Sequence, residues 1–231
     1  MEKSSLEVAG VPAVLYGKRS RKVYLYVHGK NGLASRGCPL CPHSLPGRLA
    51  GTGCRCAGAR HPEKQPGKAG AVGGHPGAAG GLRPDASGME AHIRVYGVSI
   101  GAWFAMQALQ TQKPEKALLV SPIVDMEKLI LALMQQAGVT EEQLHAAGEI
   151  PTDFGETLSW PYLCWVREHS LHWKVPTQVL YADTDPLTGH TAMEQFRQQT
   201  GAHLTILEGG EHWFHTETQL AALQSWESCH L

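Results

Sequence analysis

The stretch Gly97-Val98-Ser99-Ile100-Gly101 decides the fold, because it reads G-x-S-x-G between a predicted strand and a predicted helix. Residues 92–96 alternate and are rich in β-branched and aromatic side chains, as expected of a buried strand. Residues 102–109 carry apolar side chains at helical spacing. The sequence therefore predicts a tight strand–turn–helix elbow with Ser99 at its tip.

An elbow of this kind presents one hydroxyl group at the carboxyl edge of a sheet, and it needs small residues on both flanks. Ser99 would sit at a helix N-terminus, where backbone N–H groups can stabilise a developing oxyanion. We predict that Ser99 is a nucleophile. The alternative is a glycine-rich turn that only connects two elements.

A nucleophilic serine needs a base and an orienting acid, and candidates for both follow in the chain order Ser, Asp, His. Asp183 and Asp185 come directly after a predicted strand at residues 177–182. His212 follows a predicted strand at residues 203–207 and the pair Gly209-Gly210. Because the chain has 13 histidines, the ordered series carries the inference rather than any one residue.

Each of these positions also has a structural interpretation. An aspartate after a strand often caps the helix that follows it. Independently of this, His212 could be a surface histidine. His215 is its near neighbour and the competing candidate for the base. We favour His212, because it follows the glycine pair closely and His215 lies nearer the terminal helix.

With these motifs the chain resembles the α/β-hydrolase superfamily, in particular small bacterial serine esterases and serine aminopeptidase-like hydrolases. The resemblance covers residues 7–32 and 89–230. Its G-x-x-D position falls on Asp185, with Asp183 as the second choice, and its G-x-x-H position falls on His212. The resemblance implies a single α/β domain over residues 1–231, with a mostly parallel central sheet flanked by helices and a small helical lid.

The same resemblance assigns an oxyanion site. Residues 22–27 alternate as a strand and lead into His28-Gly29-Lys30-Asn31-Gly32, which is similar to the family's HG-x loop. The backbone N–H groups of Lys30 and Ile100 would then bind the oxyanion. An ordinary glycine-rich hairpin loop is the alternative.

The remaining patterns predict the other elements of the domain. Residues 116–120 form a continuous apolar run that suits a strand buried on both faces. Residues 123–173 interrupt the strand–helix rhythm with three helices and are the predicted lid. Capping-box spacing at Thr140 and at Thr191 predicts two helix starts, and Gly148 is placed to end the first of these helices.

Further expected elements are an early antiparallel pair formed by residues 6–16 and 22–27, and a closing helix at 217–226. Three tryptophans, Trp103, Trp160 and Trp165, are candidates for the substrate pocket. Packing alone is the alternative explanation for them, since aromatic residues at helical spacing are often part of a core.

Composition excludes some classes of function. The formal net charge is −1, so no strong field suggests nucleic acid or an acidic membrane as a partner. The first residues lack the apolar run of a signal peptide, and no stretch is long enough to span a bilayer. We expect a cytoplasmic protein with reduced thiols. The oligomeric state is not predicted.

The segment 33–88 has a different chemistry from the rest of the chain. Gly, Ala and Pro make up just over half of it, and Val72 is its only β-branched aliphatic residue. Such a segment buries too little apolar surface to offset its ordering entropy, so we expect irregular structure. By resemblance this interval would supply a helix, a central strand and a second helix. We hypothesise that it is translated out of frame from a GC-rich gene, which sequencing of the encoding DNA would test.

The same segment contains Cys38, Cys41, Cys54 and Cys56, with His43 and His61 nearby. Four soft ligands at short range can bind zinc tetrahedrally, which is one alternative function. The C-x-C spacing of the second pair is tighter than usual, and no hydrophobic frame surrounds the cysteines. Accidental cysteines are therefore the favoured explanation, and no metal is assigned.

Taken together, the sequence predicts a serine hydrolase that cleaves an ester, thioester or amide bond of a small acyl substrate. Ser99 would attack, His212 would transfer the proton, and Asp185 would orient the imidazole. No cofactor is required by this chemistry. Two alternatives stay open: an inactive relative whose sheet is disrupted at 33–88, and a zinc-binding interaction module at 38–61.

Overall fold

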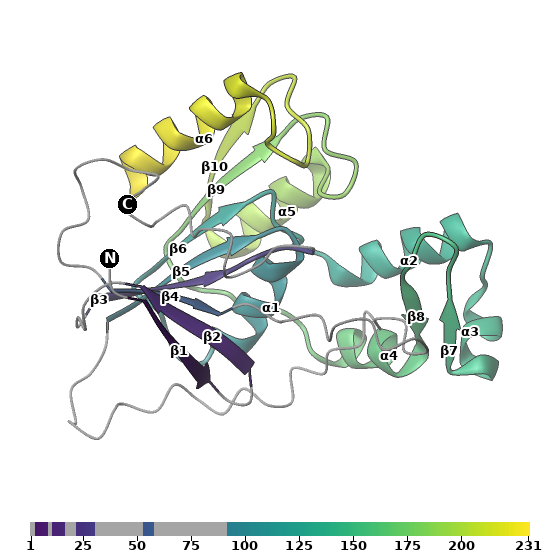
Figure 1. The fold of residues 1–231 in the computed structure, drawn as a ribbon. Coiled ribbons are helices and arrows are strands. Elements are labelled where there is room, and N and C mark those ends of the chain that lie inside the picture. The colour runs from purple at the N-terminus through teal and green to yellow at the C-terminus, as the bar shows by residue number, and fades with distance from the viewer. Residues whose placement is uncertain (1–2, 9–10, 17–21, 31–52, 58–91) are drawn as a thin grey trace. The chain divides into compact units, whose positions relative to one another are not determined.

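The structure, a computed structural model, describes residues 3–8, 11–16, 22–30, 53–57 and 92–231 (Figure 1). These residues form two compact units. The first unit holds an eight-stranded sheet with three helices, and the second is a helical unit formed by residues 125–171 of the described chain.

The sheet of the first unit is mostly parallel. Its strand order is β1-β2-β4-β3-β5-β6-β9-β10. Six neighbouring strands of this sheet, β4, β3, β5, β6, β9 and β10, run parallel to one another. Strand β2 pairs antiparallel with both β1 and β4. The bounds are β1 (Lys3–Val8), β2 (Val11–Tyr16), β3 (Lys22–Val27), β4 (Gly53–Ala57), β5 (His92–Val98), β6 (Lys116–Val120), β9 (Thr177–Ala182) and β10 (His203–Leu207). The predicted fold class is confirmed.

Three helices, α1 (Ile100–Leu109), α5 (His190–Thr200) and α6 (Glu217–His230), cover this sheet, with α6 on the face opposite α1 and α5 (Figure 1). Alternation along each strand decides which face a side chain meets. Tyr96, Leu118 and Leu180 belong to the core cluster that includes Trp226 of α6. Gly97, the next residue in β5, faces Ala102 of α1.

The early strands pair differently from the prediction. Strand β2 pairs antiparallel with β1 and β4 and not with β3, whereas β3 pairs in parallel with β4 and β5. The predicted segment 6–16 therefore holds the second half of β1 and all of β2, and the antiparallel pair is formed by residues 3–8 and 11–16.

Most of the segment 33–88 lies outside the described residues. Its five described residues, 53–57, form β4, which pairs with β2 on one side and with β3 on the other. The expectation of irregular structure is wrong for these five residues. The position between two strands supplies backbone hydrogen-bond partners, and pairing of this kind does not depend on apolar side chains. The zinc-binding alternative depends on Cys38, Cys41 and the side chains of β4, which the structure does not describe.

The second unit consists of α2 (Met126–Ala137), α3 (Glu141–Ala147), β7 (Glu149–Pro151), β8 (Thr157–Ser159) and α4 (Trp160–Glu168). The predicted capping box at the start of α3 is confirmed: Thr140 Oγ1 accepts from Gln143 N–H, and Gln143 Oε1 accepts from Thr140 N–H. Gly148 ends this helix with φ 76°, as expected. That this unit serves as a lid stays a prediction.

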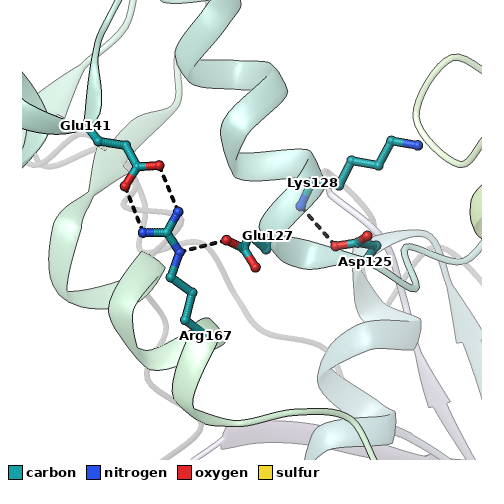
Figure 2. A network of polar contacts seen from close by, with 5 residues as sticks. All are labelled: Asp125, Glu127, Lys128, Glu141 and Arg167. Carbon is teal, nitrogen blue, oxygen red and sulfur yellow. Dashed lines mark hydrogen bonds and ion pairs between the residues drawn. The ribbon is translucent and has the colours of Figure 1, made fainter.

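A network centred on Arg167 joins the three helices of the second unit (Figure 2). The guanidinium group of Arg167 donates two hydrogen bonds of 2.8 Å to the Glu141 carboxylate and one of 2.6 Å to Glu127. Beside it, the Asp125 side chain caps α2 by accepting from Lys128 N–H at 2.9 Å. These contacts connect α4 to both α3 and α2.

The predicted capping box at Thr191 is wrong. Thr191 as N-cap would start the helix at Ala192, but α5 begins two residues earlier, at His190, and its N-cap Gly189 provides no side-chain cap. The turn after β9 explains this start, because Gly189 N–H donates to the Asp185 carbonyl oxygen and Met193 N–H to that of Gly189.

Within the described ranges, every helix is too short or too polar to cross a bilayer.

Candidate active site

Ser99 lies at the turn between β5 and α1, as predicted, in a backbone conformation that L-residues rarely adopt. Its φ is 52° and its ψ is −128°. Such a conformation costs on the order of 1–3 kcal/mol and persists only where the surroundings hold it. Here the Ser99 N–H donates to the Val120 carbonyl oxygen at 3.0 Å, and the Ser99 carbonyl oxygen accepts from Ala102 and Ile123 N–H groups.

The glycines on either side of Ser99 are required by close approaches. A Cβ atom at Gly101 would lie 2.3 Å from the His28 carbonyl oxygen, and one at Gly97 would lie 2.7 Å from Ala102 Cα. Both distances are far below van der Waals contact. The G-x-S-x-G pattern therefore reflects how tightly α1 and the loop after β3 pack against the elbow.

His212 reaches Ser99 from the loop after β10. Its Nε2 atom lies 2.8 Å from Ser99 Oγ. Both side chains are almost fully buried, with relative exposures of 8% for His212 and 9% for Ser99. Gly209, in the turn before His212, has φ 64°, a conformation that glycine adopts without strain, and the turn is closed by a hydrogen bond from Gly210 N–H to the Leu207 carbonyl oxygen.

Asp185 completes a chain of hydrogen bonds. Its Oδ2 atom lies 2.6 Å from His212 Nδ1, and its Oδ1 atom accepts from Leu187 N–H at 2.8 Å and from Thr188 N–H at 3.3 Å. Burial raises the pKa of Asp185, but the hydrogen bond and charge of His212 and the backbone donors outweigh burial, so the pKa is lowered overall. An ionised Asp185 holds the proton of the imidazole on Nδ1 and leaves Nε2 free to accept from Ser99.

The structure also separates the competing residues. Asp183 is exposed, and Asp185 rather than Asp183 contacts His212. His215 is exposed as well, and its Nδ1 atom lies 2.7 Å from the Trp213 carbonyl oxygen. The three predicted residues Ser99, Asp185 and His212 are therefore the ones that lie together.

The loop after β3 lies beside Ser99. A Cβ atom at Gly29 would be 3.0 Å from Ser99 Cβ and 3.7 Å from Ser99 Oγ. Lys30 follows in an exposed turn, and Ile100 is the first residue of α1, where N–H groups have no acceptor within the helix. Ile100 thus directly follows the serine and Lys30 directly follows Gly29, and the role of both residues as oxyanion donors stays a prediction.

The three predicted pocket tryptophans lie in different units. Trp103 is in α1 of the first unit and is 4% exposed, while Trp160 and Trp165 belong to α4 of the second unit. Trp160 packs against His145, and Trp165 stacks on Tyr162 and His169. Their common role in a substrate pocket stays a prediction.

Sequence reasoning missed several partners of the site. The backbone donors of Leu187 and Thr188 follow from the turn that begins at Asp185-Pro186, a dipeptide that is itself a turn signal. Trp213, next to His212, was not singled out either, although it is a large aromatic residue in a polar loop. Among the described residues, no group of three or more His, Cys, Asp or Glu side chains is placed to hold a metal ion.

No family model and no curated protein matches the sequence. Solved structures do match along the whole chain. The alpha/beta hydrolase domain-containing protein 10 from mouse has a TM-score of 0.68 at 13% identity, covering 99% of this chain and 98% of its own. Est1E from Butyrivibrio proteoclasticus has a TM-score of 0.62 at 14% identity, covering 98% and 97%.

An alpha-beta serine hydrolase homologue from Coxiella burnetii has a TM-score of 0.57 at 14% identity, covering 100% of this chain and 97% of its own. These similarities, together with the strand order and the elbow, show that the chain has the α/β-hydrolase fold.

Proposed function

We propose that this protein is a serine hydrolase that cleaves an ester, thioester or amide bond of a small acyl substrate. The observation that carries the proposal is the continuous hydrogen-bond chain from Ser99 Oγ through His212 to Asp185, with distances of 2.8 and 2.6 Å. A buried serine, histidine and aspartate in this order of contact form the arrangement that activates a serine hydroxyl group.

In the first half-reaction, Ser99 Oγ attacks the carbonyl carbon and its proton moves to His212 Nε2. Asp185 stabilises the resulting imidazolium and keeps the ring in one orientation. The negative charge that develops on the substrate oxygen would be bound by the backbone N–H groups of Ile100 and Lys30. The proton on His212 then passes to the leaving group, and an acyl-serine remains.

In the second half-reaction, His212 takes a proton from water, which attacks the acyl-serine and releases the acid. The strained backbone of Ser99 and the close contacts of Gly97 and Gly101 support this mechanism, because they hold the serine hydroxyl group toward His212 before substrate binds. The small acyl substrate is the expected partner, and the chemistry requires no cofactor.

The test is Ser99→Ala, with Ser228→Ala as the matched control, since Ser228 is exposed on α6. We expect the S99A variant to lose p-nitrophenyl acetate hydrolysis by roughly six orders of magnitude in kcat and to lose labelling by a fluorophosphonate. The S228A variant should keep both. Undiminished turnover in a folded S99A variant would exclude Ser99 as the nucleophile, and absence of labelling in the wild-type protein would favour an inactive relative.

A further inference from the structure

Trp213 is a large apolar side chain in direct contact with the proposed base. Five large apolar side chains are exposed among the described residues, and Trp213 is the most exposed of them, at 57%. Its ring stands perpendicular to the His212 ring, with an interplanar angle of 85° and a centroid distance of 5.4 Å. An indole left in water forgoes much of the stabilisation that burying its large surface would bring. An aromatic surface of this kind beside a reactive group is therefore available to a ligand.

The loop that carries His212 and Trp213 is fixed at both ends. Before it, the Gly210 carbonyl oxygen accepts a hydrogen bond from Thr184 Oγ1. After it, His215 Nδ1 donates to the Trp213 carbonyl oxygen at 2.7 Å, and Gln219 Oε1 accepts from His215 N–H at 3.1 Å. The exposed indole is thus presented on an anchored backbone, which limits the ordering entropy that binding must overcome.

Reaction chemistry places one part of the substrate near this indole, and the following step rests on the proposed function. When the tetrahedral intermediate collapses, the bond between the carbonyl carbon and the leaving oxygen breaks, and its electron pair stays on that oxygen. The oxygen takes the proton from His212 Nε2, and a neutral alcohol departs. The leaving group must therefore lie within hydrogen-bond distance of the imidazole that Trp213 contacts.

We propose that Trp213 forms the binding surface for the leaving group and that the preferred substrates are esters of an aromatic or bulky apolar alcohol. At this stage the acyl group is covalently bound to Ser99 Oγ. The departing alcohol, and not the acyl group, is therefore the part of the substrate that lies next to the imidazole. Leu187, which is 44% exposed and follows Asp185, adds a second apolar side chain to the loops that carry the acid and the base. Trp213 is thus a specificity-determining residue for the alcohol and not for the acyl group.

The experiment compares two alcohols on one acyl group. The ratio of kcat/KM for benzyl acetate to that for ethyl acetate is measured for the wild-type protein, Trp213→Ala, Trp213→Phe and Leu220→Ala. Leu220 is the control because it is an apolar side chain on α6 with a similar exposure of 41%. Circular dichroism establishes that each variant is folded.

We expect the benzyl-to-ethyl ratio to fall about tenfold in W213A, to recover most of its value in W213F, and to stay unchanged in L220A. The ratio for ethyl butanoate to ethyl acetate, which differ only in the acyl group, should move much less in W213A. Equal slowing of both alcohols, or an equal change in the acyl ratio, would show that Trp213 acts through the imidazole or the fold, and would overturn this inference alone. Absence of both hydrolysis and fluorophosphonate labelling in the wild-type protein would overturn the proposed function, and this inference with it.

Discussion

Asp185 and Glu227 are two carboxyl groups buried in the same unit, with 3% and 2% of their surface exposed, and their pKa values move in opposite directions. The Asp185 pKa is lowered, because His212 and two backbone N–H groups donate to its oxygens and together outweigh burial. The Glu227 pKa is raised, because burial outweighs the hydrogen bond that Glu227 accepts from Tyr96 Oη.

Both carboxyl groups belong to networks that involve the β5 region. Tyr96 lies within β5 and faces α6, whereas Ser99 follows the end of the same strand and faces His212. Burial disfavours the charged form at both positions, so the number and kind of donors decides the protonation state. Asp185, which has several donors, keeps a lowered pKa, whereas Glu227, with the Tyr96 hydroxyl group as its donor, has a raised pKa.

Replacing the Asp185 carboxylate by an uncharged amide should have the largest effect on activity. In Asp185→Asn, the amide donates toward His212 Nδ1, so the imidazole proton moves to Nε2 and that atom no longer accepts from Ser99. We expect kcat for p-nitrophenyl acetate to fall by about 10³–10⁴-fold while the protein stays folded. Steady-state kinetics and circular dichroism measure both properties.

Asp183→Asn is the matched control, because Asp183 is an exposed aspartate two residues away. This variant should keep its activity within about twofold, since surface substitutions of this kind have small effects. Loss of activity in D183N together with full activity in D185N would contradict the assignment of Asp185 as the orienting acid.

The second effect concerns stability at the other carboxyl group. An acid whose pKa is raised by folding stabilises the folded state below the pKa it has in the unfolded chain, ordinarily 4.5, and this contribution is lost as the pH rises through the raised value. Glu227→Gln does not ionise, so its unfolding temperature should match that of the wild-type protein at acid pH and exceed it at neutral pH. Asp185 has the opposite effect on stability. Its contribution to the free energy of unfolding is fully present above about pH 3.8, its ordinary pKa, and is lost as the pH falls through its lowered pKa.

Thermal unfolding between about pH 4 and about pH 8 measures the difference between the wild-type protein and E227Q. Tyr96→Phe removes a donor to the same carboxylate and should destabilise the protein by about 1–3 kcal/mol at neutral pH. Hydrolysis by E227Q should match that of the wild-type protein at 25 °C, in contrast to D185N. If the difference in unfolding temperature between E227Q and the wild-type protein did not change with pH, the prediction that ionisation of Glu227 destabilises the folded protein would be wrong.

The two carboxyl groups also mark what the sequence can and cannot predict. Strands 116–120, 177–182 and 203–207 were predicted with the observed bounds. Continuous or alternating apolar runs can be recognised within a short stretch of sequence, without knowledge of distant contacts. Asp185 and His212 were predicted from motif order, and the structure places them in contact with Ser99. By contrast, the raised pKa of Glu227 depends on Tyr96, which lies 131 residues away in sequence, and no local pattern reveals such a contact.

Other differences have equally physical reasons. Strand β4 was not predicted, because its residues Gly-Cys-Arg-Cys-Ala include no branched apolar side chain and its partners in the sheet are distant in sequence. The predicted start of α5 was wrong by two residues, because a turn closed by Asp185 and Gly189, and not a side-chain cap, begins the helix. Both cases depend on backbone hydrogen bonds, which composition does not encode.

The smallest effect comes from a third carboxylate, Glu141, which extends the comparison to an exposed surface. The Glu141 pKa is lowered by its hydrogen bonds from Arg167 (Figure 2), as the Asp185 pKa is by donors in the core. The Arg167–Glu141 pair is partly exposed, so water screens it. Arg167→Ala should therefore lower the unfolding temperature by no more than a few degrees, and the loss should shrink as NaCl is raised from about 0.05 M to about 0.5 M.

Arg197→Ala is the control, because the ion pair of Arg197 with Glu194 lies within one helix, α5. R167A should be the more destabilising of the two, since Arg167 connects α4 to both α2 and α3. Equal effects of the two variants would show that the Arg167 network adds nothing beyond an ordinary surface ion pair. The R167A variant could instead lose as much stability as Y96F, with no dependence on salt. Hydrogen-bond donors to a carboxylate would then contribute equally on the surface and in the core, and burial would not explain the different behaviour of Asp185, Glu227 and Glu141.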